Sequence, residues 1–366
     1  MNRRRIMFGT GGLVVAGTAA AGFGAYRSTG MDDYDRAASE LRARLAAHPQ
    51  LRDFVRLATL APNGHNTQPW LFGLGADHIA IGPDFTRRTP VVDPDDHHLF
   101  VSLGCAAENL SLALAAAGQG GQVRFDATGD GALAVGLSPG PAVASPLADA
   151  ITLRQSTRVD YDGRPVPAAD LATLTAAAAI PGVELLLLTD GARIEPVLEL
   201  ILAGNSAQMA DPAFVRELRS WIRFSPARAL ATRDGLFSPT NGNPAIPEWL
   251  GGLLFGFVYT PASENDKYAH QVRSSAGLAI FVSEASDKQH WVNAGRAAQR
   301  FALQATALGL KHAFVNQAVE VPAVRAQLTS LLGVGDRRPD LVMRFGYGPE
   351  TPRSLRRPVD QLLVAA

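Results

Sequence analysis

Two alanine-rich segments that lie far apart in this chain share one pattern of residues. Residues 104–108 (Gly-Cys-Ala-Ala-Glu) match residues 295–299 (Gly-Arg-Ala-Ala-Gln), and Gly118 then falls on Gly309. Alanine-rich helices can match by chance, but a strand-like segment follows each of these two, and the shared order of elements favours a tandem duplication. Two like halves in one chain are expected to pack against each other as an internal pseudo-dimer.

The periodicity of apolar residues predicts helices and strands in both halves. Residues 100–118 read as a long helix that is apolar on most faces and therefore central, and residues 185–188 read as a buried strand. Residues 138–146 (Ser-Pro-Gly-Pro-Ala-Val-Ala-Ser-Pro) form a linker. The other expected strands are 70–74, 78–82, 122–125, 132–137, 276–283 and 340–346, and the other expected helices lie within 32–60, 195–210, 213–223 and 292–308. The expected units are a leader (1–30), a first half (31–140) and a second half (147–366).

Composition excludes several classes of protein. Hydrophobic residues make up 47% of the 366 residues and charged residues 19%, which suits a globular protein with a sizeable core. Lys+Arg and Asp+Glu both number 34, and a nucleic-acid binder would normally show a basic excess. Cys105 is the only cysteine, so no intramolecular disulfide forms, and its apolar neighbours predict a buried, inert thiol.

The first thirty residues predict an export signal. Arg3, Arg4 and Arg5 precede a mildly apolar, glycine-rich run over residues 8–25. The arginines, followed by a spacer and two apolar residues, resemble the twin-arginine motif, whose export machinery carries folded proteins, often with a cofactor loaded. We therefore expect a location in the cell envelope or a periplasm-like compartment. A general secretion signal and an uncleaved membrane anchor stay open, because residues 21–25 contain no convincing A-x-A cleavage site.

Residues 61–70 (Ala-Pro-Asn-Gly-His-Asn-Thr-Gln-Pro-Trp) predict a fixed loop between a helix and a strand. Pro69 has no N–H and biases Gln68 toward an extended conformation. Side-chain amides offer both donors and acceptors, which suits a flat heteroaromatic ligand with alternating N–H and C=O edges. An ordinary turn is the alternative, since Asn, Gly and Pro are turn residues.

Three motifs in this sequence resemble those of the nitroreductase family of FMN proteins. Residues 61–70 resemble the family's A-P-S-x-x-N-x-Q-P-W, and residues 154–158 (Arg-Gln-Ser-Thr-Arg) match its R-x-S-x-R. The tail, Gly346-Tyr347-Gly348 through Arg356-Arg357-Pro358, resembles its glycine turn and basic element. The Acg-type subgroup, with tandem halves and a lid, is the most similar. The resemblance implies an α+β fold with three α/β/α layers and an FMN cofactor.

In ordinary nitroreductases the flavin site straddles a dimer interface, with R-x-S-x-R from one subunit and the asparagine loop from the other. Here each half keeps one share: nothing like R-x-S-x-R appears within residues 31–53, and residues 177–183, the counterpart of the loop, contain no amides. The resemblance therefore predicts one FMN per chain, between the halves. Its expected ligands are Arg154, Ser156 and Arg158 for the phosphate and pyrimidine edge, Pro62, Asn63, Gly64 and Asn66 for the isoalloxazine, and Arg356 and Arg357 for the phosphate.

Further expectations concern individual residues around this site. Asn63 replaces the family's serine, and either tail arginine could instead be a surface charge. Gln68 is expected to brace the loop and Trp70 to lie in the core. Replacing Asn66 by Ala should lower flavin retention without unfolding the chain.

Two other segments allow more than one reading. Residues 93–98 (Asp-Pro-Asp-Asp-His-His) look metal-like, but the spacing fits no standard site and helix capping is the better interpretation. Residues 234–268 are rich in glycine, proline and aromatic residues, and long irregular segments of this kind are usually functional when ordered. The resemblance implies a lid over the flavin, and extra core packing between the halves is the alternative.

Two functions follow from these expectations. The first is an FMN-dependent oxidoreductase that passes hydride through the flavin N5 between a small-molecule donor and acceptor, with no side chain demanded as acid or base. The second is a flavin-binding or flavin-sequestering protein with little turnover. The partners expected are these small molecules and the export machinery, without nucleic acid; membrane association through the N-terminus and further self-association stay open.

Overall fold

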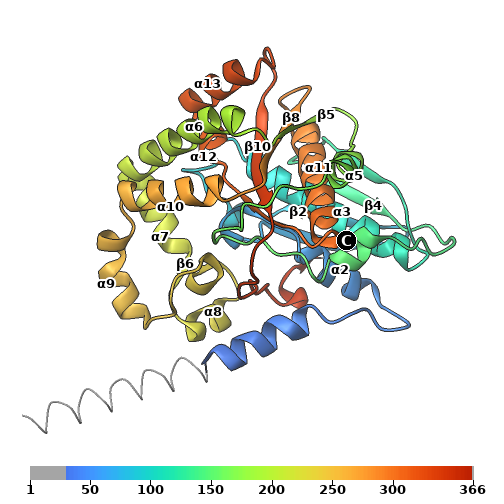
Figure 1. Cartoon of the computed structure of the whole chain (residues 1–366). Coiled ribbons are helices and arrows are strands. Elements are labelled where there is room, and N and C mark those ends of the chain that lie inside the picture. Colours follow the sequence, from blue (N-terminus) through green and yellow to red (C-terminus); the bar gives the residue numbers. More distant parts are fainter. Residues whose placement is uncertain (1–29, 365–366) are drawn as a thin grey trace, which may run out of the picture.

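The computed structural model describes residues 30–364, which form helices packed around two main sheets (Figure 1). The predicted export signal falls almost entirely on residues 1–29, outside the described part of the chain. The described chain begins with a helix over residues 30–41, drawn in blue in Figure 1. The fold class is α+β, as the sequence predicted.

The two sheets repeat one topology. The first half contributes strands in the order β1-β2-β4-β3 and the second half strands in the order β5-β8-β10-β9, with every neighbouring pair antiparallel. The strands of the first sheet are β1 (Trp70–Leu74), β2 (His78–Pro83), β3 (Val123–Asp126) and β4 (Ala132–Gly136). Those of the second are β5 (Val183–Leu188), β8 (Gly277–Ser283), β9 (Lys311–Phe314) and β10 (Pro339–Gly346).

The helices follow the same repeat. Helix α2 (Leu51–Thr59) precedes β1 as α5 (Ala168–Ala177) precedes β5, and α3 (His97–Ala116) follows β2 as α11 (Lys288–Ala307) follows β8. The second half differs by insertions. Between β5 and β8 lie α6 (Gly191–Ala210), α7 (Pro212–Trp221), α8 (Pro226–Thr232), α9 (Glu248–Val258) and α10 (Pro261–Arg273), and between β9 and β10 lie α12 (Gln317–Glu320) and α13 (Pro322–Leu332). The short strands β6 (Ile222–Arg223) and β7 (Leu236–Phe237) pair within the first insertion.

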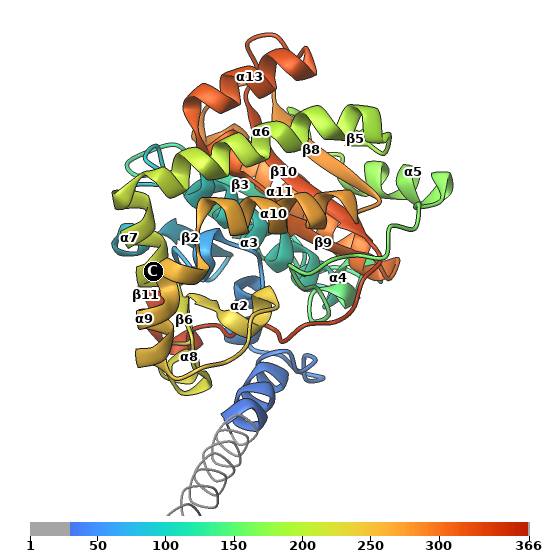
Figure 2. The same cartoon turned by 60° about the vertical axis from the view of Figure 1, so that its left-hand side comes forward.

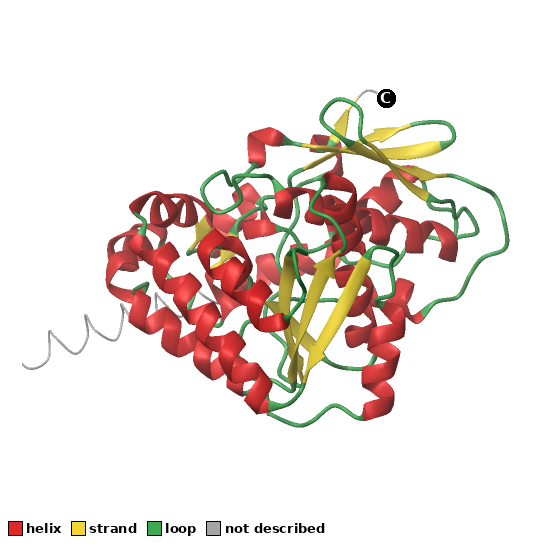
Figure 3. Cartoon of the chain, turned by 90° about the horizontal axis from the view of Figure 1, so that it is seen from above, coloured by secondary structure: helices red, strands yellow, loops and turns green. Residues whose placement is uncertain are grey.

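Burial of the strands decides how many layers cover each sheet. Every residue of β8 is buried, because Phe281 faces α11 while Ile280 faces the helices of the insertions, so helices cover both faces of the second sheet. In β2 the burial alternates, with Ile79 and Ile81 facing the core. Helices therefore cover the first sheet on one face, and Figure 3 shows this sheet at the rim of the molecule. The three-layer arrangement is built around the second sheet.

The two central helices cross at a pair of glycines. A Cβ on Gly104 of α3 would lie 2.1 Å from the carbonyl oxygen of Val292, and a Cβ on Gly295 of α11 would lie 2.0 Å from that of Val101. The two contacts are reciprocal, since each glycine meets the residue three positions before the other. The matched glycines of the sequence pattern therefore allow the backbones of α3 and α11 to touch.

Both ends of the described chain pack on the opposite half. Strand β11 (Leu363–Val364) adds to the edge of the first sheet, parallel to β1. Tyr34 and Ala37 of the first helix pack with Ala229 and Phe237 from the insertion of the second half. The linker therefore divides the sequence into two halves, but in the fold the first helix packs on the second half and the C-terminal strand β11 packs on the first half.

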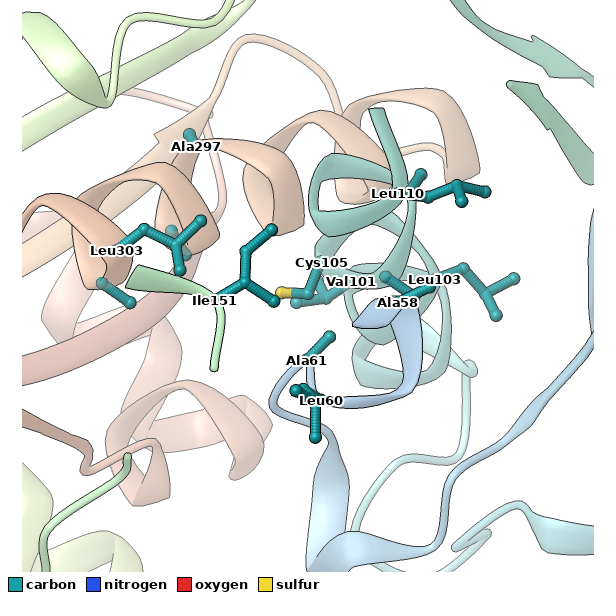
Figure 4. Packing of buried hydrophobic residues seen from close by; sticks show 14 of the residues in the cluster. Ala58, Leu60, Ala61, Val101, Leu103, Cys105, Leu110, Ile151, Ala297 and Leu303 are labelled. Atoms are coloured by element: carbon teal, nitrogen blue, oxygen red, sulfur yellow. The ribbon is translucent and has the colours of Figure 1, made fainter. Parts of the chain in front are cut away.

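The core supports the expectation for the lone cysteine. Cys105 lies among apolar side chains from α2, α3 and the segment after α4 (Pro146–Ala150), as Figure 4 shows. Burial raises the pKa of its thiol to about 12, and Sγ donates to the carbonyl oxygen of Gly295 at 3.1 Å. Helix α3 itself is long and apolar enough to cross a membrane, but 78% of its apolar window is buried inside the protein, as expected of a central helix.

Two sequence expectations need restating. Residues 234–268, expected to be irregular, hold the whole of α9 and the first part of α10, because the glycines and prolines there lie at helix starts and inside a helix. The metal-like segment caps α3 as expected: the carboxylate of Asp93 accepts from the backbone N–H groups of His98 and Leu99, both at 2.9 Å. Among the described residues no group of three potential ligands could hold a metal ion.

Candidate functional site

The loop between α2 and β1 has a strained backbone that its own side chains hold in place. His65, Asn66 and Gln68 have positive φ angles of 46°, 55° and 56°, which is uncommon for residues other than glycine. The side-chain oxygen of Asn63 accepts from the backbone N–H of Gln68 at 2.7 Å and closes the loop on itself. The loop is therefore fixed, as predicted. Gln68, however, lies in the left-handed region and not in the extended conformation that Pro69 was expected to favour, because hydrogen bonds of its backbone and buried amide hold it there. Strain of this kind gathers at functional sites.

Arg356 fastens the C-terminal tail to this loop. Its guanidinium donates to the carbonyl oxygens of Thr59 (2.5 Å), Ala61 (3.0 Å) and, more distantly, Leu60, and to the side-chain oxygen of Asn66 (2.9 Å). Burial holds the pKa of Arg356 well below its usual range, yet every N–H has an oxygen to meet. Its hydrogen bonds make Arg356 an anchor of the loop.

Asn66 and Gln68 are also committed to the protein. The amide of Asn66 donates to the carbonyl oxygens of Gly235 (3.0 Å) and Leu355 (3.3 Å). Gln68 is fully buried, its amide donates to Arg233 at 2.9 Å, and its oxygen accepts from the backbone N–H of the residue after Arg356 at 2.7 Å. Gln68 braces the loop, as expected, and Trp70 is completely buried in the core, also as expected.

Arg154 joins the second half to the first. It lies in the segment between α4 and α5, and its Nη2 donates to the carbonyl oxygen of Leu60, at the end of α2, at 2.9 Å. Nη1 lies 3.4 Å from the hydroxyl of Ser156, while Nε is buried without a hydrogen-bond partner among the described residues. Buried polar groups are nearly always paired, so the orphaned Nε calls for an explanation.

A small cavity of about 50 Å³ lies where these segments meet. Four arginines, Arg42, Arg154, Arg158 and Arg356, line it together with the hydroxyl-bearing Ser156 and Ser354, and its lining includes no carboxylate. Burial is the main reason that the pKa values of Arg42 and Arg154 are lowered, to about 9 and about 10. The charges repel one another in a place shielded from water, and an anion would relieve that repulsion.

A larger cavity of about 220 Å³ adjoins the small one, and both are lined by Pro62, Asn63 and Arg158. The loop residues Gly64 and His65 form one wall. A Cβ on Gly64 would meet no atom within 4 Å, so the backbone there faces open space. The rest of the lining mixes apolar side chains with amides, including Val101, Phe214, Leu218, Phe314, Asn205, Gln271, Asn316 and Gln317.

Arg158 stands at the junction of the two cavities. Its guanidinium makes no hydrogen bond or ion pair with any residue that the structure describes, although its neighbour Arg154 does. Burial lowers the pKa of Arg158, with the phenols of Tyr268 and Tyr161 opposing the shift. A shielded cation without a protein partner is costly, and it is the form that a site for an anionic ligand takes.

The structure brings together most of the residues singled out from the sequence. Arg154, Ser156, Arg158, Pro62, Asn63, Asn66 and Arg356 all line the small cavity, and Gly64 lines the larger one. Arg357 lines neither: its Nη1 lies 3.6 Å from Asp84, and its Nη2 donates to the carbonyl oxygen of Gln361. Residues 177–183, the counterpart of the loop in the second half, line neither cavity.

Arg42 and Ser354 are among the lining residues of the small cavity that sequence reasoning missed. Arg42 follows the helix over residues 30–41 and reaches the cavity because that helix packs on the opposite half. Ser354 lies two residues before Arg356, so the basic tail motif could have indicated it, whereas no local pattern marks Arg42. The packing of the first helix alone brings Arg42 there.

A buried acid and base also face the larger cavity. His98 Nε2 lies 3.5 Å from the carboxylate of Glu320, which accepts from the amide of Gln208 at 2.7 Å. Burial lowers the pKa of His98 and raises that of Glu320, so both groups favour their neutral forms. The two adjacent histidines of the sequence contact different partners, since Nε2 of His97 lies 2.9 Å from the carboxylate oxygen Oδ1 of Asp340.

Comparison with known proteins identifies full-length relatives. The chain is 28% identical over 326 residues to "Putative NAD(P)H nitroreductase Rv3131" of Mycobacterium tuberculosis, which covers 86% of this chain and 90% of the relative. It is 24% identical over 323 residues to "Putative NAD(P)H nitroreductase acg" of the same organism, covering 85% and 94%. Both relatives are named as nitroreductases, which supports the resemblance of this chain to the nitroreductase family. No family model matches the chain.

Solved structures similar to this one include a nitroreductase with bound FMN from Bacteroides fragilis (20% identity, 56% of this chain and 90% of that chain, TM-score 0.35). Another is the FMN-dependent nitroreductase NfnB from Mycobacterium smegmatis in complex with NADPH (13% identity, 59% and 91%, TM-score 0.37). Scores this low do not place any residue of the site.

Proposed function

We propose that this protein is an FMN-dependent oxidoreductase of nitroreductase type that holds one FMN per chain between its two halves. The observation that carries the proposal is the pair of adjoining cavities at the contact between the asparagine loop and the Arg154–Arg158 segment. The names of the full-length relatives support the reaction class.

The residues present fit a flavin phosphate. The small cavity offers the Nε of Arg154 and the guanidinium of Arg158, neither with a hydrogen-bond partner within residues 30–364, and the hydroxyl of Ser156, and its described lining has no carboxylate to repel an anion. A phosphate monoester carries nearly two negative charges at neutral pH, and arginine binds phosphate in a planar, bidentate fashion. Arg42 adds a further donor, because its Nε is also buried and has no partner in the described part of the chain. Arg356 supports the site by holding the loop.

The larger cavity fits the flat ring system. Its loop wall presents Asn63 and the open backbone at Gly64, and the facing wall presents Phe314 and amides. When bound, FMN supplies hydride transfer through its N5. The chain binds and orients the ring, keeps water out with apolar walls, and holds a proton on the buried pair of Glu320 and His98. No side chain is assigned a catalytic role.

Tandem halves explain why one site forms rather than two. The repeated strand order and the reciprocal glycine contact support an internal pseudo-dimer. Only one of the two pseudo-equivalent positions combines amides with arginines, and the other has residues 177–183 without amides. We propose that the missing share was lost from each half after duplication.

The decisive experiment measures flavin and its reduction. Purified protein should be yellow, with flavin absorption bands and an FMN-to-chain ratio near one; a ratio near two, or a colourless protein that refuses FMN, refutes the site. Stopped-flow mixing with NADH or NADPH should then bleach the bound flavin, and a quinone or nitroarene should restore it. A flavin that neither bleaches nor exchanges would favour a flavin-sequestering protein.

Export and the role of the inserted helices extend this proposal. The arginines and apolar run of the leader support export through the twin-arginine route with the cofactor already bound. Leu236, Asn241, Tyr259, Glu264, Lys267 and Tyr268, all from residues 234–268, line the larger cavity. We propose that this segment covers the flavin as a lid.

A further inference from the structure

Helix α9 presents an apolar face to solvent. Trp249, Leu253 and Phe257 are 72%, 64% and 80% exposed, and their spacing of four residues puts them on one side of the helix. Leu254 and Val258 extend the same face. Residues 249–260 contain no charged side chain. A contiguous exposed apolar surface on a protein marks a binding surface.

The buried side of α9 fixes this orientation. Gly251 faces the ring of Phe224 so closely that a Cβ there would lie 2.2 Å from the ring. Phe255, on the same side, packs with Phe224 and Ile222 in a small core of its own. The helix cannot roll to bury its apolar face without losing these contacts, so the face points outward by construction.

The charges beside this face are positive. Arg219 of α7 donates to the carbonyl oxygen of Gly252 at 2.9 Å and lies over the ring of Phe255, and Arg216, one turn earlier, is exposed. The acidic side chains on the same elements face inward. Glu217 accepts from two backbone N–H groups of the segment before α3, and Glu248 accepts from those of Phe224 and Ser225.

The leader joins the body at the same end of the molecule. A Cβ on Gly30 would lie 3.2 Å from Pro226, the first residue of α8. Figures 1 and 2, seen from two directions, both place α8, α9 and the start of the first helix at one end. The sequence upstream of Gly30 carries three arginines and an apolar run. The described chain therefore begins at the end of the molecule that carries α9.

We propose that α9 docks on a lipid bilayer, with Trp249, Leu253 and Phe257 in the interfacial region and Arg216 and Arg219 at the level of anionic headgroups. Helices that lie in a membrane surface combine an apolar face, aromatic side chains and a basic border in this way. A protein partner fits less well, because protein interfaces carry a polar rim and several hydrogen bonds, and on this face the Trp249 indole N–H is the one side-chain hydrogen-bonding group. Tyr259, which follows α9, lines the larger cavity, so the docked face and the cavity share a wall.

This inference does not depend on the proposed function, and fluorescence of the full-length protein tests it. Of the four tryptophans, Trp70 and Trp291 are buried, and Trp249 is the most exposed. Vesicles of phosphatidylcholine and phosphatidylglycerol with brominated acyl chains should lower the emission of Trp249 by at least half. The quenching should disappear in Trp249→Phe and persist in the matched variant Trp221→Phe, because Trp221 lies under Arg87 and Arg223.

A second variant separates docking by α9 from anchoring by the leader. Leu253→Ser/Phe257→Ser keeps Trp249 as the reporter, and because both side chains are exposed, its thermal midpoint should match that of the wild type. Its quenching should fall at least threefold even where the protein still sediments with vesicles. Unquenched Trp249 emission in wild-type protein that sediments with vesicles overturns the proposal. So does a dimer in vesicle-free solution that this variant converts to a monomer, because α9 would then bind a second copy.

Discussion

The two arginines Arg158 and Arg356 line the same cavity, yet substituting each by methionine should have opposite effects. The guanidinium of Arg158 makes no hydrogen bond with the described residues, whereas that of Arg356 donates to four backbone carbonyl oxygens and to Asn66. Arg158→Met should therefore weaken FMN binding and leave the flavin-free protein as stable as the wild type or slightly more stable. Arg356→Met should destabilise the flavin-free protein.

The expected magnitudes follow from the contacts. Hydrogen bonds to charged groups contribute about 1.5–3 kcal/mol, so losing one arginine–phosphate contact should raise the Kd for FMN roughly 10- to 100-fold. Removing Arg158 also removes a desolvated cation, so the free energy of unfolding without flavin should change by less than about 0.5 kcal/mol or should rise. Removing Arg356 leaves buried carbonyl oxygens unpaired at about 1–3 kcal/mol each, so a loss of at least about 3 kcal/mol is expected.

Two measurements on each variant separate the effects. Urea denaturation of flavin-free protein gives the free energy of unfolding, and quenching of FMN fluorescence on titration with protein gives the Kd. Arg158→Met should raise the Kd for FMN and leave the free energy of unfolding unchanged or higher, whereas Arg356→Met should lower the free energy of unfolding. If Arg158→Met lost more than about 2 kcal/mol of stability and bound FMN normally, Arg158 would be a structural residue and the phosphate assignment would be wrong.

Three further predictions concern the loop, the helix crossing and the buried carboxylate. Asn66→Ala should lower flavin retention, as its sequence motif suggested. It should also lower the free energy of unfolding, measured by urea denaturation, by at least about 2 kcal/mol, because Arg356 and two carbonyl oxygens lose their hydrogen-bond partner. An unchanged flavin content would count against the site. Gly104→Ala should lower the free energy of unfolding by about 1–3 kcal/mol or more, because the added Cβ forces α3 away from α11. The matched control Gly256→Ala, also inside a helix, should be neutral or stabilising, because a Cβ there meets no atom within 4 Å. Equal denaturation midpoints for the two variants would refute the close crossing. Burial raises the pKa of Asp93 to about 7, so between about pH 4 and pH 7 the folded protein binds a proton that the unfolded chain has released. The free energy of unfolding should therefore fall as pH rises through this range, by up to about 1.4 kcal/mol per pH unit. Asp93→Asn should flatten this slope in denaturation curves, and an identical slope in the variant would place the titration elsewhere.

Much of the fold could be predicted because its signals are local. The apolar run over residues 185–188, the alternation in residues 78–82 and the alanine-rich pattern of the two central helices each indicated an element that the structure contains. The inserted segment was predicted less well. Helix α9 has glycines at Gly251, Gly252 and Gly256, which lower helix propensity, and packing on Phe224 decides its conformation.

The candidate site, like the fold, was predicted in part from the sequence. The motifs indicated which residues meet, because a loop rich in amides and a segment with two arginines are readable one at a time. They did not indicate which arginine is committed to the protein. Arg356 and Arg357 are neighbours in one basic motif, yet Arg356 is buried against the end of α2 while Arg357 turns to Asp84. Hydrogen-bond partners of a side chain come from the tertiary fold, so no local pattern could separate the two.

The sequence by itself determined the fixed loop and the buried thiol, since each depends on residue types and spacing within one segment. The shared pattern of two distant segments indicated the repeat, and the resemblance to the nitroreductase family implied the α+β class. The tertiary structure decided how the halves close: a reciprocal glycine contact, the exchange of terminal segments, and the meeting of Arg42, Arg154 and Arg158 at one cavity. The physical reason is distance along the chain. Propensity and periodicity act over a few residues, whereas burial and charge repulsion act between segments that only folding brings together.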